Sequence, residues 1–112
     1  MTLEELLGNA IEVRNGNGLP EIAHEARTML GQEGFQVARI GNHIDFGMEQ
    51  TTIFYRPGAE RVARALSAKF FPTSRLEPSQ KLPEDVNLKI ILGRDLLKQP
   101  QLLEKLAAEG DN

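Results

Sequence analysis

Alternating apolar and polar positions predict five strands. In the first, Ile11 and Val13 fall on one face while Glu12 and Arg14 fall on the other, as in a half-buried strand. Four later segments are rich in β-branched or apolar residues and end at Gly, Pro or polar residues. The predicted strands cover residues 10–15, 35–40, 51–56, 74–77 and 87–92.

Apolar residues at three- and four-residue steps predict two longer helices. The first begins near Pro20 and ends near Gly34, and the second follows the turn at Pro57 and Gly58. Two shorter helices are predicted over residues 3–7 and 101–109. The buried positions expected of the longer helices are Leu19, Ile22, Ala23, Ala26, Met29 and Leu30, then Val62, Ala63, Leu66 and Phe70.

The order β-α-β-β-α-β-β predicts an α+β two-layer sandwich, with two helices on one face of a mixed or antiparallel sheet. Its split β-α-β arrangement resembles a ferredoxin-like sandwich. Residues 10–95 form the predicted domain, after a linker or short helix over residues 1–9. Residues 96–112 are predicted to form a helical tail, and the sequence leaves open whether that tail packs on the domain.

Composition narrows the class of protein. The 112 residues suit one domain, and 13 Lys and Arg against 16 Asp and Glu give a net charge of −3. That balance argues against nucleic-acid binding, which favours a basic excess. The absence of Cys excludes disulfides and thiolate chemistry. No apolar run is long enough for a membrane span, and the acidic start is unlike a signal peptide, so an export signal would lie outside this chain.

The turn after the first strand is the first candidate site. It consists of Asn15, Gly16, Asn17 and Gly18, and a helix follows it. A dinucleotide-binding loop would need a small residue where Glu21 stands, and a carboxylate there would repel a pyrophosphate. Backbone amides and the two Asn side chains could instead hold a carboxylate or a sugar hydroxyl. If the Asn17 side chain points to solvent, Asn17→Ala should leave stability almost unchanged.

Catalytic and metal chemistry have little support. His43, Asp45 and Glu49 share one loop, but two or three possible ligands without a fixed scaffold are weak evidence for a metal. No serine has the surroundings of a nucleophile. The sequence therefore predicts neither an enzyme nor a cofactor.

Two strand ends carry the remaining candidates. Tyr55 and Arg56 end the third strand, and Tyr55 would serve either as a stacking platform or as a core residue. Arg94 and Asp95 follow the last strand. Either the two side chains form a weak local ion pair, or Asp95 caps the helix that follows. The capping role is the preferred interpretation.

An ordered set of segments also resembles a known family. The segments cover residues 11–18, 34–37, 41–42, 52–60 and 88–95. Together they resemble the LytR C-terminal domain family, a small module of bacterial cell-envelope proteins. The resemblance spans residues 10–95 and implies an extracytoplasmic, non-catalytic accessory domain. The family's older label as a transcriptional attenuator gains no support from this acidic chain, which shows no DNA-reading helix.

Two functional hypotheses follow. The first is a binding module that recognises peptidoglycan or a related wall glycan. The alternative is a protein–protein scaffold that docks envelope assembly partners, for example through a free sheet edge. Neither involves nucleic acid or a membrane span in this chain. The candidate ligand-binding residues are Asn15, Gly16, Asn17, Gly18, Tyr55, Arg56 and Arg94.

Overall fold

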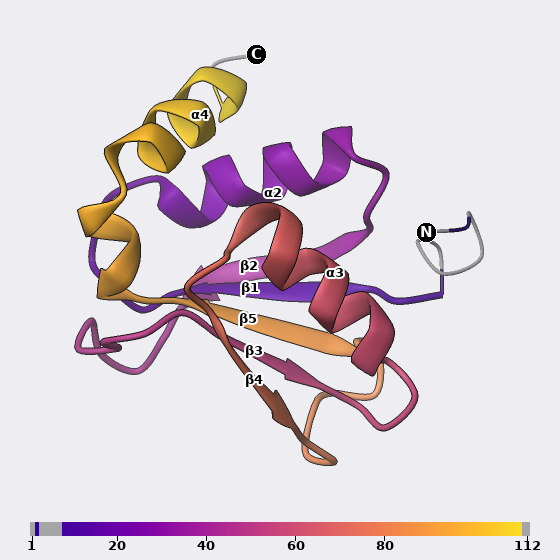
Figure 1. Cartoon of the computed structure of the whole chain (residues 1–112). Coiled ribbons are helices and arrows are strands. Elements are labelled where there is room, and N and C mark those ends of the chain that lie inside the picture. Colours follow the sequence, from indigo (N-terminus) through magenta and orange to yellow (C-terminus); the bar gives the residue numbers. More distant parts are fainter. Residues whose placement is uncertain (1, 3–7, 111–112) are drawn as a thin grey trace.

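The computed structural model describes residue 2 and residues 8–110, so the helix predicted over residues 3–7 lies outside the described residues. A five-stranded sheet forms one layer, and the helices lie on one side of it (Figure 1). The α+β sandwich predicted from the sequence is confirmed. The elements in chain order are β1 (Ile11–Asn15), α2 (Ile22–Gln32), β2 (Val37–Asn42), β3 (Thr52–Tyr55), α3 (Glu60–Phe70), β4 (Arg75–Pro78), β5 (Leu88–Leu92), the 3₁₀-helix η1 (Arg94–Lys98) and α4 (Pro100–Gly110).

The strand order is β2-β1-β5-β3-β4. β1 runs parallel to both β2 and β5, while β3 is antiparallel to β5 and parallel to β4. The sheet therefore joins two β-α-β units through β5, the last strand of the chain. This order differs from the ferredoxin-like arrangement, in which another strand separates the two strands of each unit. Here β1 and β2 are hydrogen-bonded neighbours, as are β3 and β4.

The core lies between the sheet and the helices. β1, β3 and β5 turn alternate residues toward α2 and α3, as the alternation predicts. Leu88, Ile90 and Leu92 of β5 are fully buried there. The predicted stripes on α2 and α3 are confirmed, except that Leu19 is 36% exposed because it precedes the helix and lies in the turn. Gly34 ends the α2 segment with a φ of 97°.

α4 packs against α2 at the edge of the helical layer (Figure 1). Leu106 is fully buried, and Leu102 and Leu103 are half-buried against the core. The helix begins at Pro100, whose fixed φ suits the first helical position. None of the described helices is long and apolar enough to span a membrane.

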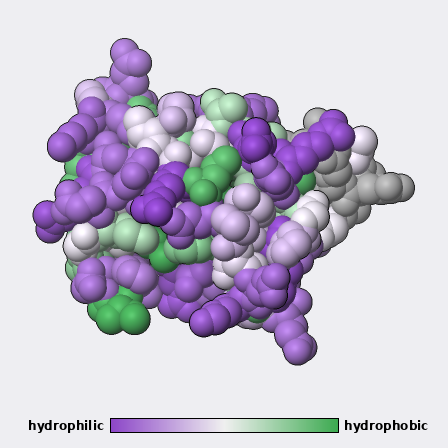
Figure 2. All heavy atoms as spheres, turned by 60° about the horizontal axis from the view of Figure 1, so that its bottom comes forward, coloured by the Kyte–Doolittle hydropathy of each residue, from purple (hydrophilic) through white to green (hydrophobic). Residues whose placement is uncertain are grey.

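The opposite face of the sheet carries charged side chains. Glu12 of β1 is only 2% exposed, because Arg14 and Arg39 contact its carboxylate at 2.7 and 3.3 Å. Arg39 also forms two hydrogen bonds to Asp85, which lower the pKa of that carboxyl below its ordinary value. Figure 2 shows this face as largely hydrophilic, with smaller hydrophobic areas among the polar side chains.

Candidate functional site

Three segments meet at one end of the sheet, where β1 and β5 reach their carboxyl ends. Asn15 pairs with Leu92 in the parallel register, so the turn after β1 lies beside the residues after β5. The loop over residues 43–50 closes over the same end. Its Met48 donates a backbone hydrogen bond to Gly16 and accepts one from Arg94. Two candidate segments predicted from the sequence, the turn after β1 and the residues after β5, therefore lie side by side because β1 pairs with β5.

Asn15 builds the turn rather than offering its amide to a ligand. Its Oδ1 accepts the backbone N–H groups of Asn17 and Gly18, both at 3.0 Å. Its Nδ2 donates to the carbonyl of Leu19 at 2.9 Å. Gly18 has a φ of 81°, the left-handed conformation expected of glycine in such a turn.

The Asn17 side chain points inward. The residue is 7% exposed, so the solvent-facing side chain considered from the sequence is wrong. Its Nδ2 donates to the carbonyl of Gly93 at 2.8 Å, and its Oδ1 accepts the N–H of Leu19 at 2.9 Å. Asn17 therefore ties the turn after β1 to the residues that follow β5.

Two glycines allow these backbones to approach each other. A Cβ on Gly16 would lie 2.7 Å from Cγ2 of Ile91 and 2.8 Å from the carbonyl oxygen of Leu92. A Cβ on Gly93 would overlap the backbone of Gln50 and Thr51. Side chains at either position would push the three segments apart, which explains why the sequence has glycine at both.

Asp95 holds η1 against β3. Its Oδ1 accepts the backbone N–H and the hydroxyl of Thr51, both at 2.8 Å, and its Oδ2 accepts the hydroxyl of Thr73 at 2.6 Å. The predicted N-cap role of Asp95 is wrong, because Gly93 occupies the cap position of η1 without a side-chain cap bond. Thr51 and Thr73 were missed from the sequence, since they lie 44 and 22 residues from Asp95.

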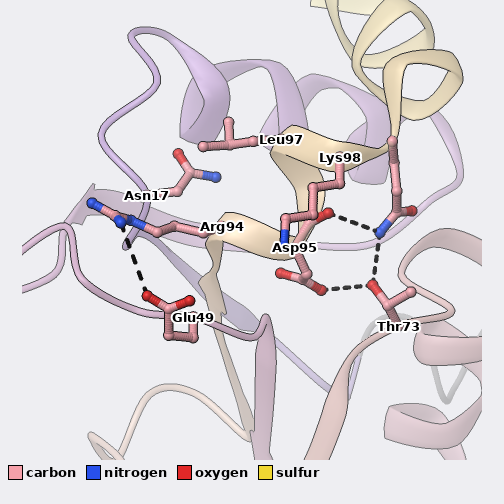
Figure 3. Close-up of a pocket in the computed structure, with 8 residues that line it drawn as sticks. Asn17, Glu49, Thr73, Arg94, Asp95, Leu97 and Lys98 are labelled. Carbon is pink, nitrogen blue, oxygen red and sulfur yellow. Dashed lines mark hydrogen bonds and ion pairs between the residues drawn. The ribbon is translucent and has the colours of Figure 1, made fainter.

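Arg94 is the predicted candidate whose side chain is exposed to solvent at this end of the sheet. Its side chain is 53% exposed, its Nε donates to the carbonyl of Phe46 at 3.2 Å, and its guanidinium lies 3.9 Å from the Glu49 carboxylate. Figure 3 shows Arg94 and Glu49 turned toward each other at one side of a cavity, with Lys98 farther along η1. The ion pair with Asp95, the less favoured alternative considered from the sequence, does not form: Arg94 lies beside Glu49.

The cavity has a volume of about 600 Å³ and is open to solvent. A guanidinium, an ammonium and a carboxylate are exposed along it, and a half-exposed leucine forms part of its wall. Such groups bind polar ligands by hydrogen bonds and ion pairs. Its lining residues are Asn17, Glu49, Thr73, Arg94, Asp95, Leu97, Lys98 and Gln99.

Exposed apolar side chains gather at this same end of the sheet. Leu19 follows the first turn, Ile44 and Phe46 belong to the loop over residues 43–50, and Leu97 lies on η1. Their exposed fractions are 36, 96, 44 and 42%, and among the described residues they are the large hydrophobic side chains exposed to that extent. The sequence assigned Leu19 to the buried stripe of the first helix and gave no sign that the other three gather here, because a single apolar residue in a loop has no periodic pattern to mark it.

Tyr55 and Arg56 lie at the other end of the sheet. β3 is antiparallel to β5, so Tyr55 pairs with Leu88, the first residue of β5. Arg56 donates to the carbonyls of Val86, Leu82 and Pro83 at 2.6–2.8 Å and thereby fixes the loop before β5. Of the predicted candidates, the turn over residues 15–18 and Arg94 therefore lie together. Tyr55 and Arg56 lie apart from this group.

Comparisons with known proteins agree with this architecture. The soluble domain of a conserved hypothetical secreted protein from Mycobacterium marinum has a similar fold, with a TM-score of 0.66 and 20% sequence identity. The match covers 81% of this chain and 62% of the mycobacterial chain, so this chain spans less than two thirds of that domain. No curated protein matches the sequence.

The family model described as "LytR cell envelope-related transcriptional attenuator" matches residues 9–96. That range contains every strand of the sheet, both β-α-β units and the turns that meet at the cavity. The resemblance noted in the sequence is thereby confirmed: the chain belongs to the LytR C-terminal domain family, whose members are associated with the bacterial cell envelope.

Proposed function

We propose that this domain is a non-catalytic, extracytoplasmic accessory module that binds peptidoglycan or a related wall glycan. The cavity at the carboxyl ends of β1 and β5 is the observation that carries the proposal. Its exposed groups, Arg94, Lys98 and Glu49, are held on segments that the buried Asn17 and the half-buried Asp95 fix in place. Rigid support of this kind lowers the entropy lost on binding.

The chemistry of the cavity suits a substituted amino sugar. Arg94 and Lys98 can bind the free carboxylates that peptidoglycan carries on its stem peptides. Glu49 can accept hydrogen bonds from hydroxyl or amide N–H groups, and Leu97 offers an apolar surface to the C–H groups of a sugar ring. The open shape allows a polymer to enter and leave along the surface.

The proposed location draws on the comparisons. The family is described as cell envelope-related, and the mycobacterial protein of similar fold is called secreted. Both descriptions support a place outside the cytoplasm, where a wall polymer is available.

Retention on purified peptidoglycan tests the proposal. The chain should sediment with insoluble peptidoglycan, and the double variant Arg94→Ala with Lys98→Ala should lower the retained fraction at least tenfold, since the loss of even one charged hydrogen bond costs roughly 1.5–3 kcal/mol. The matched control is Arg64→Ala with Lys81→Ala, which removes the same two charge types from exposed positions on α3 and in the loop before β5. Equal retention of the two double variants, or no retention of the parent chain, would overturn the proposal.

A protein–protein scaffold is the second candidate, and the free edge of β2 favours it. β2 lies at one edge of the sheet, spans six residues and contains no proline, whereas the other edge strand, β4, is four residues long and ends at Pro78. An unblocked edge can accept a partner strand. Replacing Ala38, which is exposed on β2, by Lys should weaken partner binding through this edge, because a charged side chain on an edge strand opposes strand addition, while leaving peptidoglycan retention intact.

A further inference from the structure

A second groove lies between the end of α3 and the start of α4. It has a volume of about 540 Å³ and shares only Gln99 with the cavity described above. Its walls come from the last turn of α3, the residues that follow it and the first turns of α4. The lining residues are Lys69, Phe70, Pro72, Gln99, Pro100, Gln101, Leu102 and Lys105.

The floor of this groove is apolar. Phe70 is 2% exposed and packs edge-on against Phe35, with ring centroids 6.4 Å apart. Pro72, Pro100 and Leu102 add further apolar surface. None of these four lining side chains carries a hydrogen-bonding group, so a hydroxyl of a sugar buried against them would lose its water without gaining a partner.

Two ammonium groups flank that floor. The Nζ atoms of Lys69 and Lys105 lie 5.4 and 5.8 Å from the centroid of the Phe70 ring. Lys69 pairs with Glu33 at 3.1 Å, whereas no ion pair joins Lys105 to a carboxylate among the side chains that the structure describes, which end at residue 108. The groove thus carries excess positive charge in a chain whose net charge is −3. Two like charges near one ring repel each other, and a carboxylate between them would relieve that repulsion.

We propose that this groove docks a short peptide segment of a partner protein, in which an acidic residue lies beside a bulky apolar residue. The apolar side chain packs on Pro72, Pro100 and Leu102 above the buried Phe70 ring, and the carboxylate lies between Lys69 and Lys105. This occupant satisfies both properties of the groove, its apolar floor and its positive rim. The assignment is independent of whether the first cavity binds a wall glycan.

Selection from a library of random 12-residue peptides displayed on phage provides the test. Peptides enriched on the chain should carry Asp or Glu within two positions of Leu, Ile or Phe. The synthetic form of the most enriched peptide should bind at least tenfold more weakly to the double variant Lys69→Gln with Lys105→Gln. The same loss should follow when its acidic residue is replaced by the corresponding amide.

A control variant separates local from overall charge. Lys81→Gln with Lys89→Gln removes the same two charges elsewhere and should leave peptide binding unchanged, with circular dichroism reporting that all variants are folded. Enriched peptides without an acidic residue, or equal binding to both double variants, would overturn the proposal. So would binding to phosphatidylglycerol vesicles that is lost in the Lys69 and Lys105 variant while no peptide is enriched. Peptidoglycan retention of that variant should match the parent chain, so this test and the test of the first cavity fail independently.

Discussion

Asn17 shows what a residue type can and cannot predict when its neighbours in space are unknown. The Asn and Gly residues over positions 15–18 correctly predict a tight turn, because few other residues tolerate its backbone conformations. The same pattern suggests amides free for a ligand, and that part fails. The carbonyl that binds the Asn17 side chain belongs to Gly93, 76 residues away, and no local pattern indicates such a pairing.

Replacing Asn17 by alanine should destabilise the fold. The variant leaves the carbonyl of Gly93 and the N–H of Leu19 without their partners in a buried region, a loss of about 1–3 kcal/mol. Urea denaturation followed by circular dichroism measures the free energy of unfolding. Asn42→Ala is the matched control, since its exposed side chain at the end of β2 should change stability by less than about 0.5 kcal/mol. Equal stability of the two variants would contradict the bonds assigned to Asn17.

Only part of the candidate site could be predicted from the sequence, because many of its contacts join residues that are far apart along the chain. Arg94 was recognisable as an exposed charge after a strand, and the structure places it beside the turn. The cavity also uses Thr73, Leu97 and Lys98, which belong to no motif. Leu97 and Lys98 follow Arg94 in η1, whereas Thr73 comes beside them because β3 pairs with both β5 and β4. Their contribution depends on the strand order, which residue types do not encode locally.

Among the elements, periodicity predicted the existence and type of each strand and longer helix. β2 begins at Val37 rather than at residue 35, because Phe35 follows the left-handed Gly34 and packs into the core before strand pairing begins. β2 then continues to Asn42, where its partner Asn15 ends β1. Strand boundaries of this kind depend on the partner strand. The order of strands in the sheet, which differs from the ferredoxin-like expectation, depends on which strands pair, and local patterns do not reveal this.

The packing of α4 gives a prediction at this scale. Leu106→Ala should destabilise the protein by about 2–5 kcal/mol, the usual cost of removing a fully buried leucine side chain. Thermal unfolding of the whole chain measures the change. Glu104→Ala, an exposed position on the same helix, should have little effect. If the two variants melt together, residues 96–112 act as a tail, as the sequence allowed, and not as part of the core.

For the whole molecule, the charged network on the open sheet face links stability to pH. Arg39 joins β2 to Asp85 in the loop before β5 and lowers the pKa of that carboxyl in the folded state. A carboxyl with a depressed folded pKa stabilises the fold above its unfolded pKa, about 3.9 for Asp, and loses that contribution as the pH falls through the folded pKa.

Asp85→Asn should therefore flatten the acid limb of the stability curve. The parent chain should lose more melting temperature between pH 6 and pH 2 than the variant does, and the two curves should converge at the acid end. Glu84→Gln removes a carboxylate from the neighbouring position of the same loop and should leave the shape of the curve unchanged. Parallel curves for the parent and Asp85→Asn would show that the Arg39 pair does not contribute to this dependence.

The position of β5 has a consequence for how the protein comes into being. The strand at the middle of the sheet is the last to leave the ribosome, and until it arrives the two β-α-β units have no common partner. The domain therefore closes late, in one step that joins both halves once β5 is available. A domain that closes only with β5 stays extended until then, and this is the form in which the proposed export to the cell envelope would carry it through a secretion channel.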